Sequence, residues 1–161
     1  MKMEISEVET MGTLFNRSNI LALDMLLETL RHYEESAIES FRQPEGEFDK
    51  GVIIPEDELF INFKKPAREI NCLIRSLNPF VLARTKFRGT LMKVLSADVI
   101  EGQSAKNSQT GIISKIENDK FYVTTGDGLI SITSMQFGSF FAGTAKEFIK
   151  ILDPKIGEKF L

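Results

Sequence analysis

The sequence predicts an α+β protein in which an N-terminal helix and a linker precede a small antiparallel β-barrel with short helices. Near the N-terminus, apolar residues recur with roughly the spacing of a helix. After residue 80 the pattern changes to short alternating segments, which are separated by glycine, proline and Asn-Asp turn signals. Several short strands at such spacing are typical of a small barrel, which gives the second half of the prediction.

The first helix is predicted to begin after Thr10, a suitable N-cap, and the sequence leaves open a break near Ser18-Asn19. A helix with so many apolar side chains needs a partner surface. That surface belongs either to the rest of this chain or to a larger domain at whose edge the helix would lie. The apolar positions are Met11, Leu14, Phe15, Ile20, Leu23, Leu26, Leu27, Leu30 and Tyr33.

A polar linker follows this helix. It opens on a breaker cluster, QPEGE at residues 43–47, and continues to residue 58. Residues 59–63 are predicted as a short strand. The second helix is predicted over residues 66–77, because Pro66 suits the first helical turn and Asn78-Pro79 disfavours further helix. Its apolar face consists of Ile70, Leu73, Ile74 and Leu77.

The strands of the predicted barrel follow the second helix. Arg88-Gly89 and Asn118-Asp119 are read as two-residue hairpin turns, and the GDG sequence at residues 126–128 turns into the last strand. The predicted strands are residues 81–87, 90–99, 111–117, 120–125 and 129–135.

The remaining segments are a loop, a glycine-flanked pair of phenylalanines and a short helix. Residues 101–110 are predicted as a polar loop. Gly138 and Gly143 flank either a flexible loop or a barrel corner. Thr144 is the predicted N-cap of a helix over residues 145–152.

Charge is unevenly distributed, although the net formal charge is only −3. Residues 1–60 carry 5 Lys and Arg residues against 14 Asp and Glu residues, whereas residues 61–161 carry 15 against 9. An acidic first part and a basic second part indicate two surfaces with different partners.

Cysteine use and hydropathy indicate the cellular setting. The single cysteine, Cys72, excludes an internal disulfide, so a reducing, cytoplasmic location is expected. The acidic residues Glu4, Glu7 and Glu9 argue against a signal peptide. The richest apolar stretch, residues 20–30, is interrupted by charges and too short to cross a bilayer, so no membrane partner is predicted.

No residue pattern predicts a catalytic or metal site. His32 has no nearby Ser or Cys nucleophile and is interpreted as a surface or helix-packing residue. Cys72 is interpreted as a small buried hydrophobe rather than a nucleophile, and one Cys with one His cannot supply a metal site. The carboxylates at residues 34–35 and 56–58 are interpreted as solvated, and the GDG sequence as a turn rather than a phosphate loop.

Basic residues are the stronger candidates for a binding surface. Arg84, Lys86 and Arg88 are two residues apart, so one face of a strand would present all three. Such a face would bind nucleic acid through its phosphates, in a salt-sensitive manner. The alternative is an ordinary charged outer face of a half-exposed sheet. The predicted nucleic-acid or substrate-binding residues are Lys64, Lys65, Arg84, Lys86, Arg88 and Lys93.

Several short motifs, in order, resemble one protein family. They are Ile61-Asn62-Phe63, Lys65-Pro66-Ala67, Ile74-Arg75-Ser76-Leu77-Asn78-Pro79, Gly89-Thr90-Leu91-Met92-Lys93, Gly111-Ile112-Ile113 and Thr125-Gly126-Asp127-Gly128. Together they resemble the methionyl-tRNA formyltransferase family, which includes the sugar-nucleotide formyltransferases. The resemblance divides the chain into residues 1–58, similar to the end of the catalytic domain and the linker, and residues 59–161, similar to the C-terminal domain.

The resemblance implies an OB-like barrel that positions the substrate for formyl transfer from 10-formyltetrahydrofolate to methionyl-tRNA or to an amino sugar nucleotide. The family's catalytic Asn, His and Asp and its folate pocket belong to the N-terminal domain, whose motifs do not occur here. We therefore expect no catalytic residue and no cofactor in this chain, and leave open whether it is an enzyme. Asn62-Phe63 stands where the family usually has Asp-Trp. The sequence therefore does not decide between the methionyl-tRNA branch and the sugar-nucleotide branch of the family.

The resemblance also implies partners. The expected partner is a formyltransferase catalytic domain, or a second copy of this chain in a homodimer. A tRNA is a further candidate partner. If the chain belongs to the methionyl-tRNA branch of the family, a role in translation initiation is expected. The alternative function is a stand-alone OB-like protein that binds nucleic acid.

Overall fold

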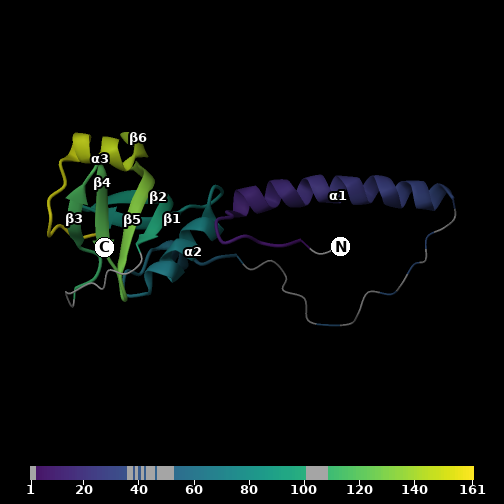
Figure 1. Ribbon diagram of the computed structural model, residues 1–161, viewed down its shortest axis with the longest axis horizontal. Helices are drawn as coiled ribbons and strands as arrows, with labels where there is room; N and C mark the ends of the chain where they lie inside the picture. Colours follow the sequence, from purple (N-terminus) through teal and green to yellow (C-terminus); the bar gives the residue numbers. More distant parts are fainter. Residues whose placement is uncertain are drawn as a thin grey trace.

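The computed structural model describes residues 3–35, 38, 40, 42, 46, 53–100 and 109–161. In this part of the chain, helix α1 projects away from a body that contains the strands and the other helices (Figure 1). The helices are α1 (Met11–Glu34), a 3-10 helix (Glu56–Leu59), α2 (Ala67–Leu77) and α3 (Ala145–Leu152). The strands are β1 (Ala83–Phe87), β2 (Thr90–Ile100), β3 (Ile113–Glu117), β4 (Lys120–Thr124), β5 (Leu129–Phe137) and β6 (Phe141–Thr144).

The strands form one antiparallel sheet in the order β1-β2-β5-β4-β3, with β6 paired to β5. The predicted α+β class with antiparallel strands is therefore confirmed. The path of named strands is open, because β1 and β3 are not paired with each other. The closed barrel of the prediction is thus not formed by the strand ladders themselves.

The C-terminal residues lie between the two edges of this sheet. Phe160 forms an isolated bridge to Phe87 of β1, and Lys159 forms one to Ile112, just before β3. Lys86 and Leu161 exchange both backbone hydrogen bonds, at 2.9 and 3.0 Å. These bonds satisfy edge groups that would otherwise be unpaired.

The core is built largely from phenylalanine. Phe87, Phe121, Phe148 and Phe160 are each at most 1% exposed. Their ring centroids are 4.9 Å apart for Phe87 and Phe160, and 5.1 Å for Phe121 and Phe148. They come from β1, β4, α3 and the C-terminal residues, so one aromatic cluster joins elements distant in sequence.

The predicted hairpin turns are confirmed. Arg88 and Gly89 have φ angles of 49° and 76°, and Asn118 and Asp119 have φ angles of 51° and 61°. Two consecutive left-handed residues are the geometry that joins twisted antiparallel strands in two residues. The helix caps are confirmed as well, because Thr10 and Thr144 each form a capping box.

In secondary structure, one point that the sequence left open is decided, and two expectations differ from the structure. Helix α1 is continuous, without a break at Ser18-Asn19. Residues 59–63 are not a strand: the 3-10 helix ends at Leu59, and Phe60 makes only an isolated bridge to Arg84 before the chain turns toward α2. Strand β6 lies where only a loop or a barrel corner is expected. It is a strand because it pairs with β5, and the local sequence does not show that pairing. Most of the predicted linker and of the loop at residues 101–110 lies outside the described residues.

The turn at residues 126–128 caps helix α2. The Ala67 backbone N–H donates to Oδ1 of Asp127 at 2.8 Å, and the Gly126 N–H donates to the Lys65 carbonyl at 3.0 Å. A side chain at Gly126 would collide with the carbonyl of Lys64. Pro66 precedes the helix and offers no capping side chain, so a residue 60 positions away performs this role.

Candidate functional site

No catalytic centre is evident in the part of the chain that the structure describes. It holds no group of three or more His, Cys, Asp or Glu residues placed to bind a metal ion. His32 is exposed on α1. The prediction of a buried Cys72 is wrong: its side chain lies exposed on the outer face of α2, with Nη2 of Arg75 3.3 Å from its sulfur. Among the described residues, no helix is long and apolar enough to cross a membrane.

Strands β1 and β2 present a basic outer face. Arg84 lies directly opposite Lys93 in the β1–β2 register, and directly opposed residues share a face. Lys86 is two residues along β1 and is exposed, whereas Thr85 and Phe87 point inward and are buried. Alternation along the strand therefore brings Arg84, Lys86 and Lys93 together. We call these three residues the basic face.

Arg88 does not belong to the basic face, because its guanidinium is bound by a carboxylate. Its Nε and Nη2 donate to the two carboxylate oxygens of Glu158 at 2.7 and 2.8 Å, and its Nη1 donates to the Leu152 carbonyl at 2.8 Å. The hydrogen bond to Glu158 raises the pKa of Arg88, and the same bond lowers the pKa of Glu158. This two-point pair fastens the β1–β2 turn to the C-terminal segment.

We expect this pair to make stability dependent on pH in the acidic range. The folded-state pKa of Glu158 lies below its ordinary value of 4.5. The contribution of Glu158 to the free energy of unfolding is therefore complete above pH 4.5 and is lost as the pH falls through the lowered pKa. Thermal unfolding of the wild type and of Glu158→Gln should differ most near neutral pH and converge at low pH. An unchanged difference across the whole acidic range would contradict this assignment.

Arg84 is held more loosely by its carboxylate partner. Its Nη1 donates to Oε1 of Glu56, in the 3-10 helix, at 2.8 Å, and no second bond joins the pair among the described residues. The Arg84 side chain is 22% exposed and that of Glu56 is 81% exposed. Nε of Arg84 is buried without a hydrogen-bond acceptor in the described structure.

The two lysines of the basic face differ from Arg84 in their partners. Within the described part of the chain, neither Lys86 nor Lys93 forms an ion pair. Lys64 and Lys65, also predicted as binding residues, lie in the turn that leads into α2, and Lys65 pairs with Glu69 at 3.6 Å. They come from a different segment than the basic face.

The carboxylates that pair with the arginines are not evident from the sequence. Glu56 belongs to an acidic run that is expected to be solvated, and nothing in the local pattern singles out Glu158. Glu56 is 28 positions from Arg84, and Glu158 is 70 positions from Arg88. Local spacing carries no signal for such pairs, because only the β-sheet and the C-terminal segment bring them together.

Helix α1 forms a second candidate surface. None of its side chains, all of which the structure describes, is buried. Its large exposed apolar side chains, among them Ile20, Leu23, Leu26 and Tyr33, have exposed fractions between 44% and 74%. Figure 1 shows the helix extending from the body without another helix or strand beside most of its length. An apolar surface of this kind marks an interaction site in a soluble protein.

Only the start of α1 is joined to the rest of the described structure. The Gly12 N–H donates to the Asn78 carbonyl at 3.0 Å, and the rings of Phe15 and Phe80 meet edge to face at 5.7 Å. A Cβ at Gly12 would lie 2.5 Å from Cδ of Pro79, so this joint needs a glycine.

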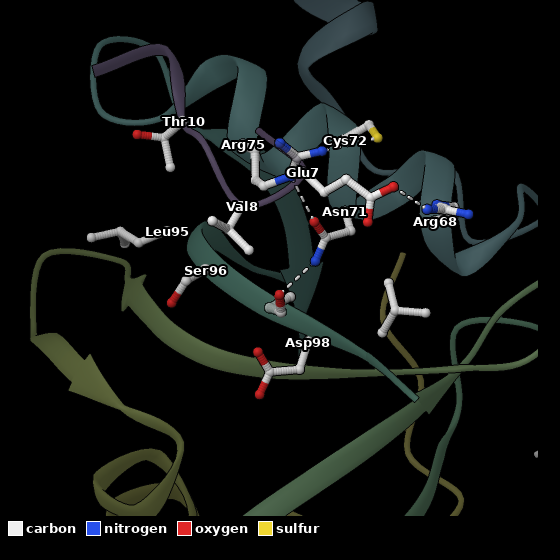
Figure 2. A pocket seen from close by; sticks show the side chains of 12 residues that line it. Glu7, Val8, Thr10, Arg68, Asn71, Cys72, Arg75, Leu95, Ser96 and Asp98 are labelled. Carbon is white, nitrogen blue, oxygen red and sulfur yellow. Dashed lines mark hydrogen bonds and ion pairs between the residues drawn. The ribbon is translucent and has the colours of Figure 1, made fainter. Parts of the chain in front are cut away.

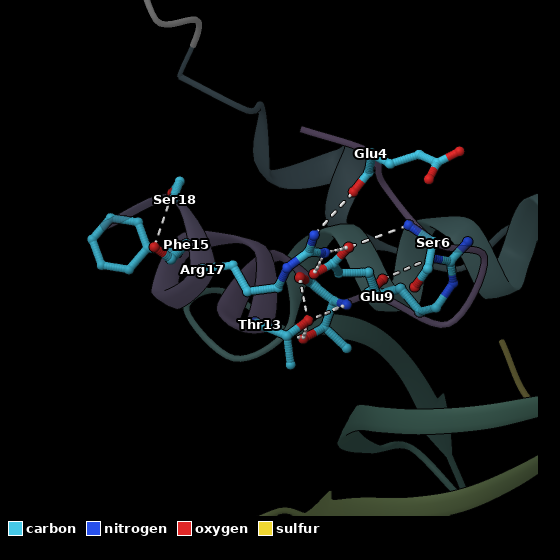
Figure 3. A network of polar contacts seen from close by, with 9 residues as sticks. Glu4, Ser6, Glu9, Thr13, Phe15, Arg17 and Ser18 are labelled. Carbon is cyan, nitrogen blue, oxygen red and sulfur yellow. Dashed lines mark hydrogen bonds and ion pairs between the residues drawn. The ribbon is translucent and has the colours of Figure 1, made fainter. Parts of the chain in front are cut away.

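The segment before α1 reinforces this joint through a polar network (Figure 3). Nη1 of Arg17 donates to both carboxylate oxygens of Glu9, at 2.5 and 2.6 Å, and the Ser6 N–H donates to the same carboxylate at 3.2 Å. The hydrogen bond from Arg17 lowers the pKa of Glu9. From α2, Nη1 of Arg75 donates to the Glu9 carbonyl at 2.7 Å. The network thus connects α1 and α2.

A groove of about 560 Å³ separates this N-terminal segment from α2 and β2 (Figure 2). Its polar side chains are largely engaged with protein groups. Arg68 pairs with Glu7 at 2.7 Å, Asn71 donates to the Ala97 carbonyl at 2.6 Å, and Arg75 is bound as described above. The groove therefore offers few free groups that could orient a ligand, and we assign it none.

Comparison with known proteins shows the family to which this chain belongs. A family model described as the formyl transferase C-terminal domain matches residues 53–152. This chain belongs to that family. The matched residues include the 3-10 helix, α2, the basic face and α3.

Curated relatives of this formyltransferase domain are longer proteins. The methionyl-tRNA formyltransferase of Acetivibrio thermocellus is 31% identical over 157 residues, which cover 98% of this chain and 50% of that protein. The methionyl-tRNA formyltransferase of Agathobacter rectalis is 35% identical over 128 residues, which cover 80% of this chain and 41% of that protein. The chain therefore spans half or less of the length of these relatives.

Solved structures show the same fold in HypX from Aquifex aeolicus. One variant of HypX matches with a TM-score of 0.72 at 12% identity, covering 98% of this chain and 28% of that one. HypX in complex with tetrahydrofolic acid matches with a TM-score of 0.63 at 14% identity, covering 86% of this chain and 24% of that one. At such identities the likeness concerns the fold alone.

Proposed function

We propose that this chain is the substrate-positioning part of a formyltransferase, which holds a tRNA acceptor while a separate catalytic domain transfers the formyl group. The observation that carries the proposal is the basic face within a formyltransferase C-terminal domain. Lys86 and Lys93, which form no ion pair within the described residues, suit the phosphates of a polyanionic acceptor. The methionyl-tRNA formyltransferases among the relatives favour tRNA over a sugar nucleotide.

The formyl donor belongs to the partner in this proposal. Family resemblance implies 10-formyltetrahydrofolate, and we place it in the partner because Arg68, Asn71 and Arg75 of the groove beside α2 already bind protein groups. The residues of this chain bind and orient the acceptor, and no step of the transfer is assigned to them.

Helix α1 is the proposed docking surface for the catalytic domain. Four of its charged side chains, at Arg17, Asp24, Glu28 and Arg31, fall within one narrow stripe of the helical wheel, and apolar side chains occupy most of the rest. A second helix of the same kind covers only one stripe of such a helix. A larger body that surrounds it therefore fits better than a homodimer through α1 alone.

The same features weigh against the alternative of a stand-alone nucleic-acid-binding protein. Such a protein has no use for a long helix with an exposed apolar surface, which promotes aggregation. An OB-like barrel serves either function, and we propose it here because the C-terminal residues bridge both edges of the open sheet. A cytoplasmic location fits a chain with one cysteine.

Binding of tRNA tests the proposal. We expect fluorescence anisotropy to show binding that weakens with salt, and the double variant Lys86→Ala/Lys93→Ala to bind less tightly. Its log–log salt slope should fall by about 1 for each phosphate that the variant no longer neutralises. The matched control is Lys120→Ala/Lys150→Ala, which removes two exposed lysines from β4 and α3.

Three outcomes are informative. Loss of affinity and slope in the first variant only would support positioning by the basic face. Equal losses in both variants would indicate attraction by net charge and contradict a defined surface. No binding of tRNA at low salt would contradict the tRNA proposal.

A further inference from the structure

We infer that Arg84, Lys86 and Lys93 form a phosphate-binding site, and that Glu56 competes with the phosphate by occupying Arg84. The inference rests on the proposed function, because it takes the phosphate from the RNA acceptor. It adds an internal acidic competitor to that function. It also distinguishes Arg84, which can exchange its partner, from Arg88, which cannot.

The first step is that Arg84 is preorganised. It is only 22% exposed, its backbone is paired with Lys93 of β2 on one side, and the Ile61 N–H donates to its carbonyl at 2.8 Å on the other. A largely buried arginine side chain on a fixed backbone has less conformational freedom to lose when its guanidinium binds an anion. Lys86 and Lys93 beside it are longer-range point charges that can turn toward the same anion.

The second step is that Glu56 is a weak and replaceable partner. A single hydrogen bond joins it to Arg84, and its side chain is 81% exposed. Exposed ion pairs contribute little, because water and salt screen them. The contrast with Arg88 is direct: Glu158 binds that guanidinium at two points, and its side chain is 28% exposed.

The third step is that the competitor belongs to a separate segment. Glu56 is the first residue of the 3-10 helix; it follows Pro55 and precedes Leu59, the residue of this helix that is buried. A phosphate oxygen that takes the place of the Glu56 carboxylate forms a charge-assisted hydrogen bond to Nη1 of Arg84. The phosphate is also attracted by the positive charges of Lys86 and Lys93. The displaced carboxylate returns to water, where it is already mostly solvated.

Removal of the Glu56 charge tests the inference. Glu56→Gln retains the size of the side chain and the capacity to accept a hydrogen bond. We expect it to tighten tRNA binding by about 1.5- to 5-fold, the range for an exposed ion pair. The salt slope should steepen by up to about 0.9, because Arg84 would then exchange a counterion for the phosphate.

The control is Glu117→Gln, which removes the same charge from an exposed pair with Lys115 in β3. A second control repeats Glu56→Gln in an Arg84→Gln background, where the gain should disappear if the two residues act as a pair. Thermal unfolding checks that each variant is folded. Equal effects of Glu56→Gln and Glu117→Gln, or a gain that persists without Arg84, would overturn the inference and leave the proposed function intact.

Inorganic pyrophosphate separates the two proposals further. If no variant binds tRNA, the tRNA proposal fails, and NMR titration with pyrophosphate then decides the inference by itself. Amide shifts at Arg84, Lys86 and Lys93 that saturate at lower concentration in Glu56→Gln than in Glu117→Gln would support the competitor. Identical titrations would overturn it.

Discussion

Replacement of Phe160 by alanine is expected to lower the free energy of unfolding by about 3–5 kcal/mol, the range for a fully buried phenylalanine. The side chain is 1% exposed, and its ring lies 4.9 Å from that of Phe87 and 6.0 Å from those of Phe63 and Phe121. It therefore packs against β1, β4 and the segment before α2 at once. Truncation would leave a cavity where these elements meet, next to the bridges that join β1 and β3 to the C-terminal segment.

Urea denaturation followed by circular dichroism would measure this loss as a lower midpoint. Leu161→Ala is the matched control, because this neighbouring side chain is 68% exposed while its backbone is hydrogen-bonded to Lys86. That variant should change stability by less than about 0.5 kcal/mol. A similar midpoint for Phe160→Ala and wild type would mean that the C-terminal segment does not contribute to the core.

The second large effect is expected for Gly126→Ala, with a loss at the upper end of about 1–3 kcal/mol. The added methyl group would press on the Lys64 carbonyl, which is backbone and cannot turn aside. Separation of the two segments would also lengthen the hydrogen bond from Ala67 to Asp127 and so remove the cap of α2. Gly46→Ala is the control, since none of the described residues has an atom within 4 Å of the point that the Cβ would occupy.

A double-mutant cycle separates the clash from the cap. Asp127→Ala alone should lose about 0.5–2 kcal/mol, the value of an N-cap. If Gly126→Ala acts partly by disrupting the cap, the double variant should lose less stability than the sum of the two single losses. Full additivity in urea midpoints would show that the glycine and the cap act independently, contrary to the geometry.

The candidate site was predictable in part. Residues two apart on a strand share a face, so the sequence alone placed Arg84 and Lys86 together, and the hairpin register added Lys93. The partners of the arginines were beyond this reasoning. Glu56 binds Arg84 at one point, from 28 positions away, and Glu158 binds Arg88 at two points, from 70 positions away.

The sequence by itself determined the local elements: both capped helices, the two hairpin turns with left-handed residues, and the alternation of the strands. Each depends on neighbouring residues, through caps, turn conformations and side-chain period. Only the tertiary structure decided that Asp127 caps α2, that Phe160 lies between the sheet edges, that Cys72 faces outward, and that α1 buries none of its apolar side chains. Those outcomes depend on which distant surfaces meet, and a local pattern of residues does not specify that.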